Sequence, residues 1–138
     1  MDIQNLNCKY NSKNEFVSLV REILAEHGYL VESPKRLEGL SGTTHKFDIL
    51  AKSRNGSITV EFLEPHLADE AAVVALYAKI IDTKNLLNPA KIFLVTLQKI
   101  SQAGKNLAQQ YEFTVLEAKD RESFTKEFKT HLKNLQSP

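Results

Sequence analysis

The chain has 138 residues, a length that predicts a single domain with a substantial core. Its 18 basic and 17 acidic residues leave a net charge of +1, so any nucleic-acid surface must be a local patch. The single cysteine excludes an internal disulfide and argues against a cysteine-based zinc site. No apolar run approaches the ~18 residues of a membrane span and no signal-peptide pattern is present, so we expect a cytoplasmic protein with no membrane partner.

The first elements are a helix and a short strand. Residues 1–11 are polar and aperiodic, which predicts a loose lead-in. Ser12 and Glu15 form a capping box, and helix-spaced apolar residues follow it: Phe16, Leu19, Val20, Ile23 and Leu24. Gly28 is expected to end this helix as a left-handed cap, and a strand is expected over 29–31.

A glycine-containing loop and a hairpin form the centre of the chain. Strands are expected over 46–52 and 57–63, joined by a turn that ends in Asn-Gly, the strongest short hairpin signal. Asp48 and Glu61 interrupt these otherwise apolar strands. An ionised carboxylate in a buried strand is costly unless it is paired or holds a metal, so the two acids predict a site.

The second half alternates helices with strands. Asp69 is expected to cap a helix with a buried stripe of Val73, Leu76, Tyr77, Ile80 and Ile81. The β-branched run over 91–97 predicts a strand buried on both faces. Ser101 is expected to cap a helix to Gln110 with Ala103, Leu107 and Ala108 facing inward, and a last strand is expected over 113–116.

The chain should end in an amphipathic helix over 121–135. Its apolar stripe predicts packing on the sheet, with a dimer face as the alternative: Phe124, Phe128, Leu132 and Leu135. The order of elements predicts one α/β domain over 1–138, a mixed β-sheet flanked by helices on both faces.

These features together resemble a known family. The chain resembles the PD-(D/E)xK nuclease superfamily in five features. They are a helix ending in Gly28-Tyr29, the run SGTTHKFDILA, a hairpin into Val60-Glu61, the strand IFLVT and the run SQAGKNLAQQYEFTVLEA. Within it, the Mrr-like and Holliday-junction-resolvase-like endonucleases are the most similar. The resemblance covers roughly Phe16 to Ala118 and implies a restriction-endonuclease-like fold and a metal-dependent phosphodiester hydrolase site.

The resemblance also implies roles for particular residues. Asp48 and Glu61 match the family's acids, which makes them the expected catalytic residues and the ligands of a Mg²⁺ ion. The family's lysine follows the second acid by two residues, where this chain has Leu63. Many members carry a glutamate in the first helix, where this chain has Val17. The site is therefore expected to be degenerate, unless a lysine reaches it from elsewhere, with Lys46, Lys52 and Lys84 as candidates.

Other residues are candidates for contacts with nucleic acid. Main-chain amides around Ser41 and Gly42, beside Gly39, either cradle a phosphate or form a turn that needs glycine. His45 either touches a phosphate or a metal-bound water, or staples the loop. The basic candidates for the DNA backbone, which are otherwise solvated charges, are Lys46, Lys99 and Lys105.

Three functions are compatible with this pattern. The first is a DNA-binding protein of nuclease fold that cleaves poorly or not at all. The second is an active Mg²⁺-dependent endonuclease with a relocated lysine. The third is a non-catalytic assembly subunit, as a homodimer or with a protein partner, which the near-neutral charge favours. Whether the chain is an enzyme is left open by the sequence.

Overall fold

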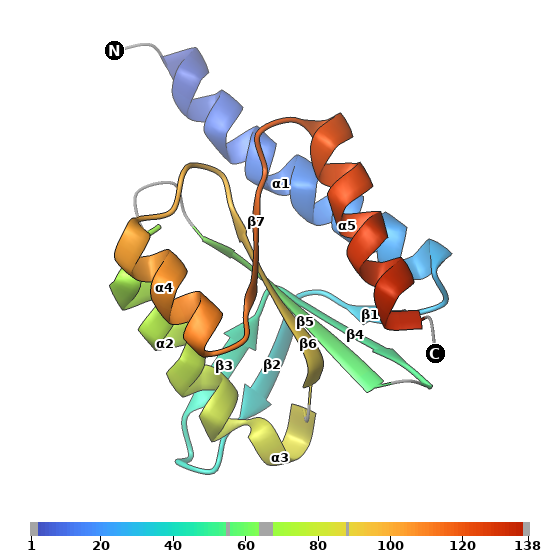
Figure 1. Cartoon of the computed structure of the whole chain (residues 1–138). Coiled ribbons are helices and arrows are strands. Elements are labelled where there is room, and N and C mark those ends of the chain that lie inside the picture. The colour runs from blue at the N-terminus through green and yellow to red at the C-terminus, as the bar shows by residue number, and fades with distance from the viewer. Residues whose placement is uncertain (1–2, 55, 64–67, 88, 137–138) are drawn as a thin grey trace.

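The computed structural model describes residues 3–54, 56–63, 68–87 and 89–136 (Figure 1). Its strands are β1 (Leu30–Glu32), β2 (Lys35–Glu38), β3 (Thr44–Phe47), β4 (Ile49–Ser53), β5 (Gly56–Leu63), β6 (Pro89–Thr96) and β7 (Thr114–Glu117). Its helices are α1 (Ile3–Glu26), α2 (Glu70–Asp82), α3 (Lys84–Leu87), α4 (Gln102–Gln110) and α5 (Arg121–Gln136).

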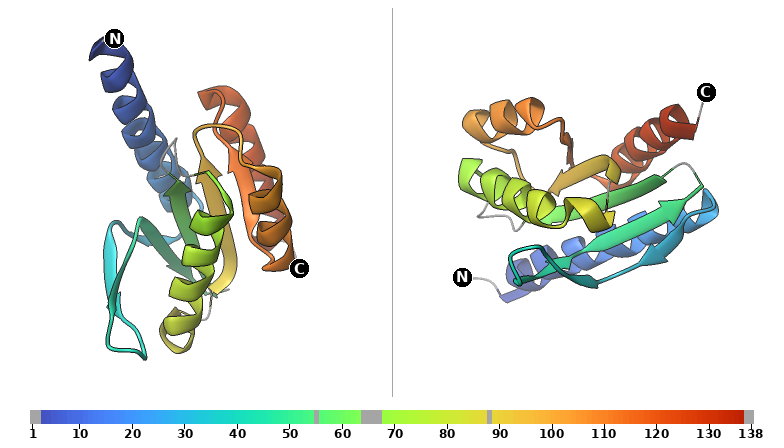
Figure 2. Two further views of the ribbon diagram at one scale, coloured as in Figure 1. Left: turned by 90° about the vertical axis from the view of Figure 1, so that its left-hand side faces the viewer. Right: turned by 90° about the horizontal axis from the view of Figure 1, so that it is seen from below.

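A five-stranded mixed sheet forms the middle of the molecule. Its strand order is β1-β4-β5-β6-β7, and β2 and β3 form a separate two-stranded sheet. The pairs β1–β4 and β4–β5 are antiparallel, whereas β5–β6 and β6–β7 are parallel. Parallel neighbours need a crossover, which α2 and α4 supply (Figures 1 and 2). The predicted mixed sheet with helices on both faces is confirmed.

Two hydrophobic cores lie on opposite faces of the sheet, because successive side chains of a strand point to opposite sides. Val60 and Phe62 of β5 face the core under α1 and α5. Leu94 of β6 faces the core under α2 and α4, while its neighbours Phe93 and Val95 face the first core. The prediction that the 91–97 run is a strand buried on both faces is confirmed.

Some predicted boundaries are wrong. Helix α1 begins at Ile3, so the loose lead-in expected over 1–11 is incorrect for residues 3–11. No glycine or proline interrupts this segment, and a helix propagates from turn to turn without needing an apolar face. The strand expected over 46–52 is interrupted at Asp48, and β2 was not predicted at all. Short strands that pair only in a hairpin carry little periodic signal.

The caps expected at Asp69 and Ser101 are found, whereas Ser12 and Glu15 lie inside α1 and do not cap it. Asp69 Oδ1 accepts a hydrogen bond from Ala72 N, and Ser101 Oγ accepts one from Gly104 N. Tyr77 and Ile81, however, are 37% and 46% exposed, so the predicted stripe of α2 is too wide. In α4, Ala103 was expected to face inward but is exposed, and the neighbouring Gly104 is buried instead. No helix in the described part of the chain is long and apolar enough to cross a membrane.

The C-terminal helix packs on its own sheet. Phe124, Phe128 and Leu132 are buried in the first core, and the Phe128 ring meets the Phe93 ring edge-on at 5.1 Å. Leu135 packs against the same core from the edge. The apolar stripe of α5 is therefore used inside the chain, as predicted, and does not form the alternative dimer face.

We expect Phe128→Ala to lower the free energy of unfolding by about 3–5 kcal/mol, since it leaves a cavity in a closely packed core. Urea unfolding followed by circular dichroism measures this change. The neighbouring exposed substitution Lys129→Ala is the control and should stay within about 0.5 kcal/mol. A loss below about 1 kcal/mol in Phe128→Ala would contradict the described packing of α5.

Candidate functional site

The candidate site lies where one extended segment leaves the main sheet. Residues 44–53 run through β3 and β4 with a single break at Asp48. On one side of the break, Ile49 pairs with Val60 of β5. On the other side, β3 turns away and pairs with β2. Continuing the β4–β5 register by one residue places Asp48 opposite Glu61, on the sheet face that α2 covers.

Each of the two acids accepts a hydrogen bond from the main chain of the opposite strand segment. Phe62 N donates to Asp48 Oδ2 at 2.9 Å, and Asp48 N donates to Glu61 Oε1 at 2.8 Å. Each carboxylate thus serves a main-chain N–H that the divergence of the strands would otherwise leave without a ladder partner. The sequence predicted that Asp48 and Glu61 belong together, and the structure places them side by side.

Lys79, which the motif spacing does not single out, completes the site. Lys79 of α2 places Nζ 2.9 Å from Glu61 Oε2. The same ammonium donates to the main-chain oxygen of Lys46 and lies 4.6 Å from the centre of the Phe47 ring. Both side chains of the ion pair are largely buried, with 18% of Lys79 and 12% of Glu61 exposed.

The predicted replacement lysines do not occupy this position. Lys46 contributes only its main-chain oxygen, and its side chain is exposed. Lys52 and Lys84 are exposed and contact neither acid. One feature of the sequence could have indicated Lys79. It lies beside Leu76 and Ile80 in an otherwise apolar helix, and a lysine that is buried there needs a partner.

Burial raises the pKa of Glu61 from 4.5 to about 7. The positive charge of Lys79 lowers this pKa and the nearby charge of Asp48 raises it, but both act less strongly than the loss of water. Glu61 therefore exchanges its proton close to neutral pH, within the range in which such a group is useful in a catalytic site.

The two positions where the family pattern fails are apolar in the structure as well. Leu63 lies on the same face of β5 as Glu61 and packs, half-buried, against the second core. The β5–β6 register is regular from Ile58 to Leu63, so no bulge turns this residue elsewhere. Val17 packs against the first core, which lies on the other face of the sheet from Glu61.

The loop of the β2–β3 hairpin is fastened to the end of α2. Asp82 Oδ1 accepts from Ser41 N at 2.8 Å, and Oδ2 accepts from Ser41 Oγ at 2.7 Å. His45 Nε2 lies 2.7 Å from the same Oδ2. Hydrogen bonds from Ser41 and then His45 hold the pKa of Asp82 below its usual range. Of the two roles predicted for His45, the structure shows the contact that holds the loop, through Asp82.

Two glycines of this loop have different reasons for being glycine. Gly42 has a φ of +87°, a left-handed conformation that side chains disfavour. At Gly39 a Cβ atom would lie 2.0 Å from Asp82 Oδ2, so a side chain would displace the carboxylate that holds the loop. The turn interpretation of this segment therefore accounts for both residues, and its use as a phosphate cradle stays a prediction.

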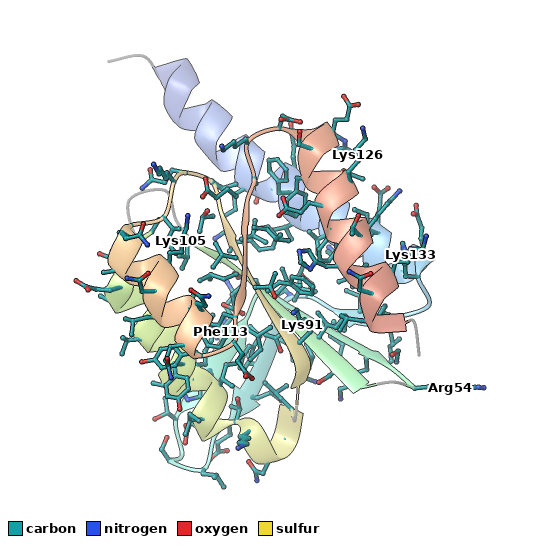
Figure 3. The ribbon with its side chains drawn as sticks, in the orientation of Figure 1. Arg54, Lys91, Lys105, Phe113, Lys126 and Lys133 are labelled. Carbon is teal, nitrogen blue, oxygen red and sulfur yellow. The ribbon has the colours of Figure 1, made fainter. Side chains whose placement is uncertain are left out.

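Two of the basic candidates, Lys99 and Lys105, lie apart from the acid pair. Lys99 follows β6 and lines a cavity of about 240 Å³ with Thr96, Glu117 and Lys119. Lys105 is exposed on α4 (Figure 3). Neither takes part in the hydrogen bonds and ion pair that join Asp48, Glu61 and Lys79. The described residues contain no group of three or more histidine, cysteine or acidic side chains placed to hold a metal.

The fold has counterparts among solved structures. A protein of unknown function, AF1548, superposes with a TM-score of 0.64 at 19% identity over 86% of this chain and 65% of its own. Can2 from Sulfobacillus thermosulfidooxidans, in complex with cyclic tetra-adenylate, superposes with a TM-score of 0.61 at 12% identity over 91% of this chain and 35% of its own. The chain thus spans less than two thirds of either protein.

At these identities the likeness concerns the fold. The restriction-endonuclease-like fold expected from the sequence is confirmed. No protein-family model and no curated protein matches the sequence.

We expect Glu61 to make the stability of the chain depend on pH. Below pH 4.5 its carboxyl is protonated in the folded and the unfolded chain; between 4.5 and about 7 only the unfolded chain releases the proton. Stability should therefore fall as the pH rises through this window, by of the order of 3 kcal/mol in total. Urea unfolding at pH values across the window measures it, with Glu61→Gln as the control that lacks this fall. Identical pH profiles for both proteins would contradict the raised pKa.

We expect Asp82→Ala to loosen the hairpin loop, because Ser41 and His45 lose their shared acceptor. Amide hydrogen exchange over residues 39–46 should become at least ~10-fold faster. Glu70→Ala, which removes the same charge from the exposed first turn of the same helix, should leave this segment unchanged. Equal exchange in Asp82→Ala and the unsubstituted chain would show that the contact does not hold the loop.

Proposed function

We propose that this chain is a divalent-metal-dependent nuclease that acts on DNA, with its essential lysine supplied by helix α2. The observation that carries the proposal is the ion pair between Lys79 Nζ and Glu61 Oε2 at 2.9 Å, directly beside Asp48. Two acids and a lysine thus meet at one point of a nuclease fold, although the lysine comes from a different element than the family pattern predicts.

The acid pair offers the carboxylate oxygens that a Mg²⁺ ion needs as ligands. Asp48 Oδ1 has no hydrogen-bond donor among the described residues, and Asp48 is only half-buried. Each oxygen of Glu61 accepts one hydrogen bond, which leaves each with a further lone pair. Mg²⁺ is commonly held by one or two carboxylates together with waters and substrate phosphate, so Asp48 and Glu61 fit as its ligands. When bound, the ion would polarise a phosphodiester and activate water.

The protein's own groups have distinct roles in this proposal. Lys79 fixes the Glu61 carboxylate in position and presents a positive charge where negative charge develops on the phosphate. The hydrogen bond from Phe62 N keeps Asp48 aimed at the same point. Leu63 supplies no charge and only closes the site against the second core. Contacts with the DNA backbone are proposed for Ser41, Gly42, His45, Lys46, Lys99 and Lys105.

A non-cleaving DNA-binding protein is the second candidate. The observation that favours it is that the acids already have partners within the protein: every hydrogen bond from the described residues to the carboxylates of Asp48 and Glu61 comes from a main-chain N–H or from Lys79. An acid pair that is held by such bonds without a metal can persist for structural reasons alone. The placement among Mrr-like or Holliday-junction-resolvase-like enzymes stays a prediction under either candidate.

We expect cleavage of plasmid or branched DNA in Mg²⁺ or Mn²⁺, and we expect Lys79→Met to reduce the rate by about 100-fold or more. Lys84→Met, which removes an exposed charge five residues later, should leave the rate unchanged. The double variant Leu63→Lys with Lys79→Met tests the geometry further. It restores a lysine at the family position on the same face as Glu61 and should recover part of the lost activity.

Two results would contradict the nuclease proposal. The first is DNA left uncut by the unsubstituted chain in both metals. The second is cleavage that survives both Asp48→Ala and Glu61→Ala. Uncut DNA that still binds the chain in a salt-sensitive and chelator-insensitive manner would instead support the second candidate.

A further inference from the structure

Helix α2 has an outer face unlike that of the other surface helices. Its residues between Ala71 and Ile81 include six exposed side chains, all of them uncharged: Ala71, Val74, Ala75, Tyr77, Ala78 and Ile81. The charged residues of this stretch and its end, Lys79 and Asp82, turn inward to Glu61 and to the hairpin loop. A surface helix normally presents polar residues to water, and one that is apolar all round is normally buried.

The rest of the molecule follows the ordinary rule. The outer face of α5 carries charged side chains, and Lys126 and Lys133 point away from the sheet in Figure 3. The exposed residues of α4 are mostly polar, and they include Gln102, Lys105 and Gln109. In Figure 2 (left), α2 lies at the front of the molecule and no other helix or strand crosses it. Among the helical residues whose exposure the structure describes, the large uncovered apolar side chains lie on α2 and at Leu86 of the adjacent α3.

The apolar face extends beyond the helix at both sides. The Tyr77 ring stacks on Tyr111 at the end of α4, with centroids 4.0 Å apart and an interplanar angle of 13°. Leu86 in α3 is 52% exposed. Contiguous apolar patches of this kind on otherwise polar proteins mark interaction surfaces.

We propose that this face binds the same face of a second copy of the chain, with the two α2 helices antiparallel about a two-fold axis near Leu76. In such an isologous contact, residues equally far from the axis on the two helices meet. The pairs near the middle of the face set an alanine against a larger side chain: Ala71 with Ile81, and Ala78 with Val74. On the flank of the face, Ala75 lies beside its own copy. Small residues opposite large ones let two helices approach closely and interlock.

Charge at the helix ends supports the antiparallel arrangement. Asp69 and Glu70 make the start of α2 acidic, and the exposed Lys84 follows its end. An antiparallel pair brings the acidic start of one helix to the basic end of the other and aligns the helix dipoles favourably. A parallel pair would set like charges together at both ends, so the second copy fits in one orientation.

The test is the mass of the full chain in solution. Light scattering and sedimentation at micromolar concentrations should give a dimer that dissociates on dilution. Ala75→Glu places a charge beside the axis, and we expect it to raise the dissociation constant by at least about 100-fold. Ala103→Glu is the matched control, since it makes the same substitution at an exposed alanine of α4, and it should leave the dimer unchanged.

A charge-reversal pair establishes that the partner is a second copy. Ala75→Glu and Ala75→Lys should each be monomeric alone, and an equimolar mixture should form a heterodimer. Circular dichroism of each variant checks that the helix content is retained. A monomeric unsubstituted chain would overturn the proposal and assign the face to a different partner, and a dimer insensitive to Ala75→Glu would overturn the proposed surface. Neither result depends on whether the chain cleaves DNA.

Discussion

The break at Asp48 is the constraint on which the site depends. At this residue one extended segment passes from the main sheet into the β2–β3 hairpin, so the ladder between β4 and β5 ends there. Main-chain N–H groups at such a break need acceptors, and the carboxylates of Asp48 and Glu61 supply them. An acid buried for this purpose needs a cation, because an unpaired buried charge is costly. Lys79 meets that need and links the sheet to α2.

Helix α2 therefore serves the site through three residues of its last turn. Lys79 reaches Glu61 and the main chain of β3, while Asp82 holds the hairpin loop. Ile80, between them, packs into the second core. Between Ala71 and Ile81 the only charged residue of α2 is Lys79, and because it is directed inward the outer face of this stretch is apolar. A second copy bound there would also stabilise the helix that positions Lys79.

The contacts among Asp48, Glu61 and Lys79 are compatible with a catalytic role and with a purely structural role. The reciprocal hydrogen bonds orient both acids without help from a metal, which is the preorganisation that a catalytic site requires. They also explain how the acids would persist in a chain that only binds DNA. In a nuclease, loss of Lys79 lowers the cleavage rate, whereas in a chain that only binds DNA Lys79 contributes to stability alone.

Local patterns were sufficient to predict much of the fold. The apolar spacing of α1 and α5, the capping residues Asp69 and Ser101 and the β-branched run of β6 each depend on neighbours along the chain, and each is found in the structure. The sequence also placed Asp48 and Glu61 on adjacent strands, because a hairpin connects residues that are close in sequence. Local patterns did not predict the start of α1, the strand β2, the break at Asp48, the outer edge of the α2 stripe or the exposure of Ala103.

The identity of the lysine was decided only by the tertiary structure. Lys79 lies 18 residues from Glu61 along the chain. It reaches the acid because the crossover from β5 to β6 lays α2 over the sheet face that carries Glu61. Nothing in the spacing of the motif specifies how a crossover helix is rotated about its axis. That rotation follows from the packing of Val73, Leu76 and Ile80 on the sheet, and it directs Lys79 to the site while leaving Val74, Tyr77 and Ile81 exposed.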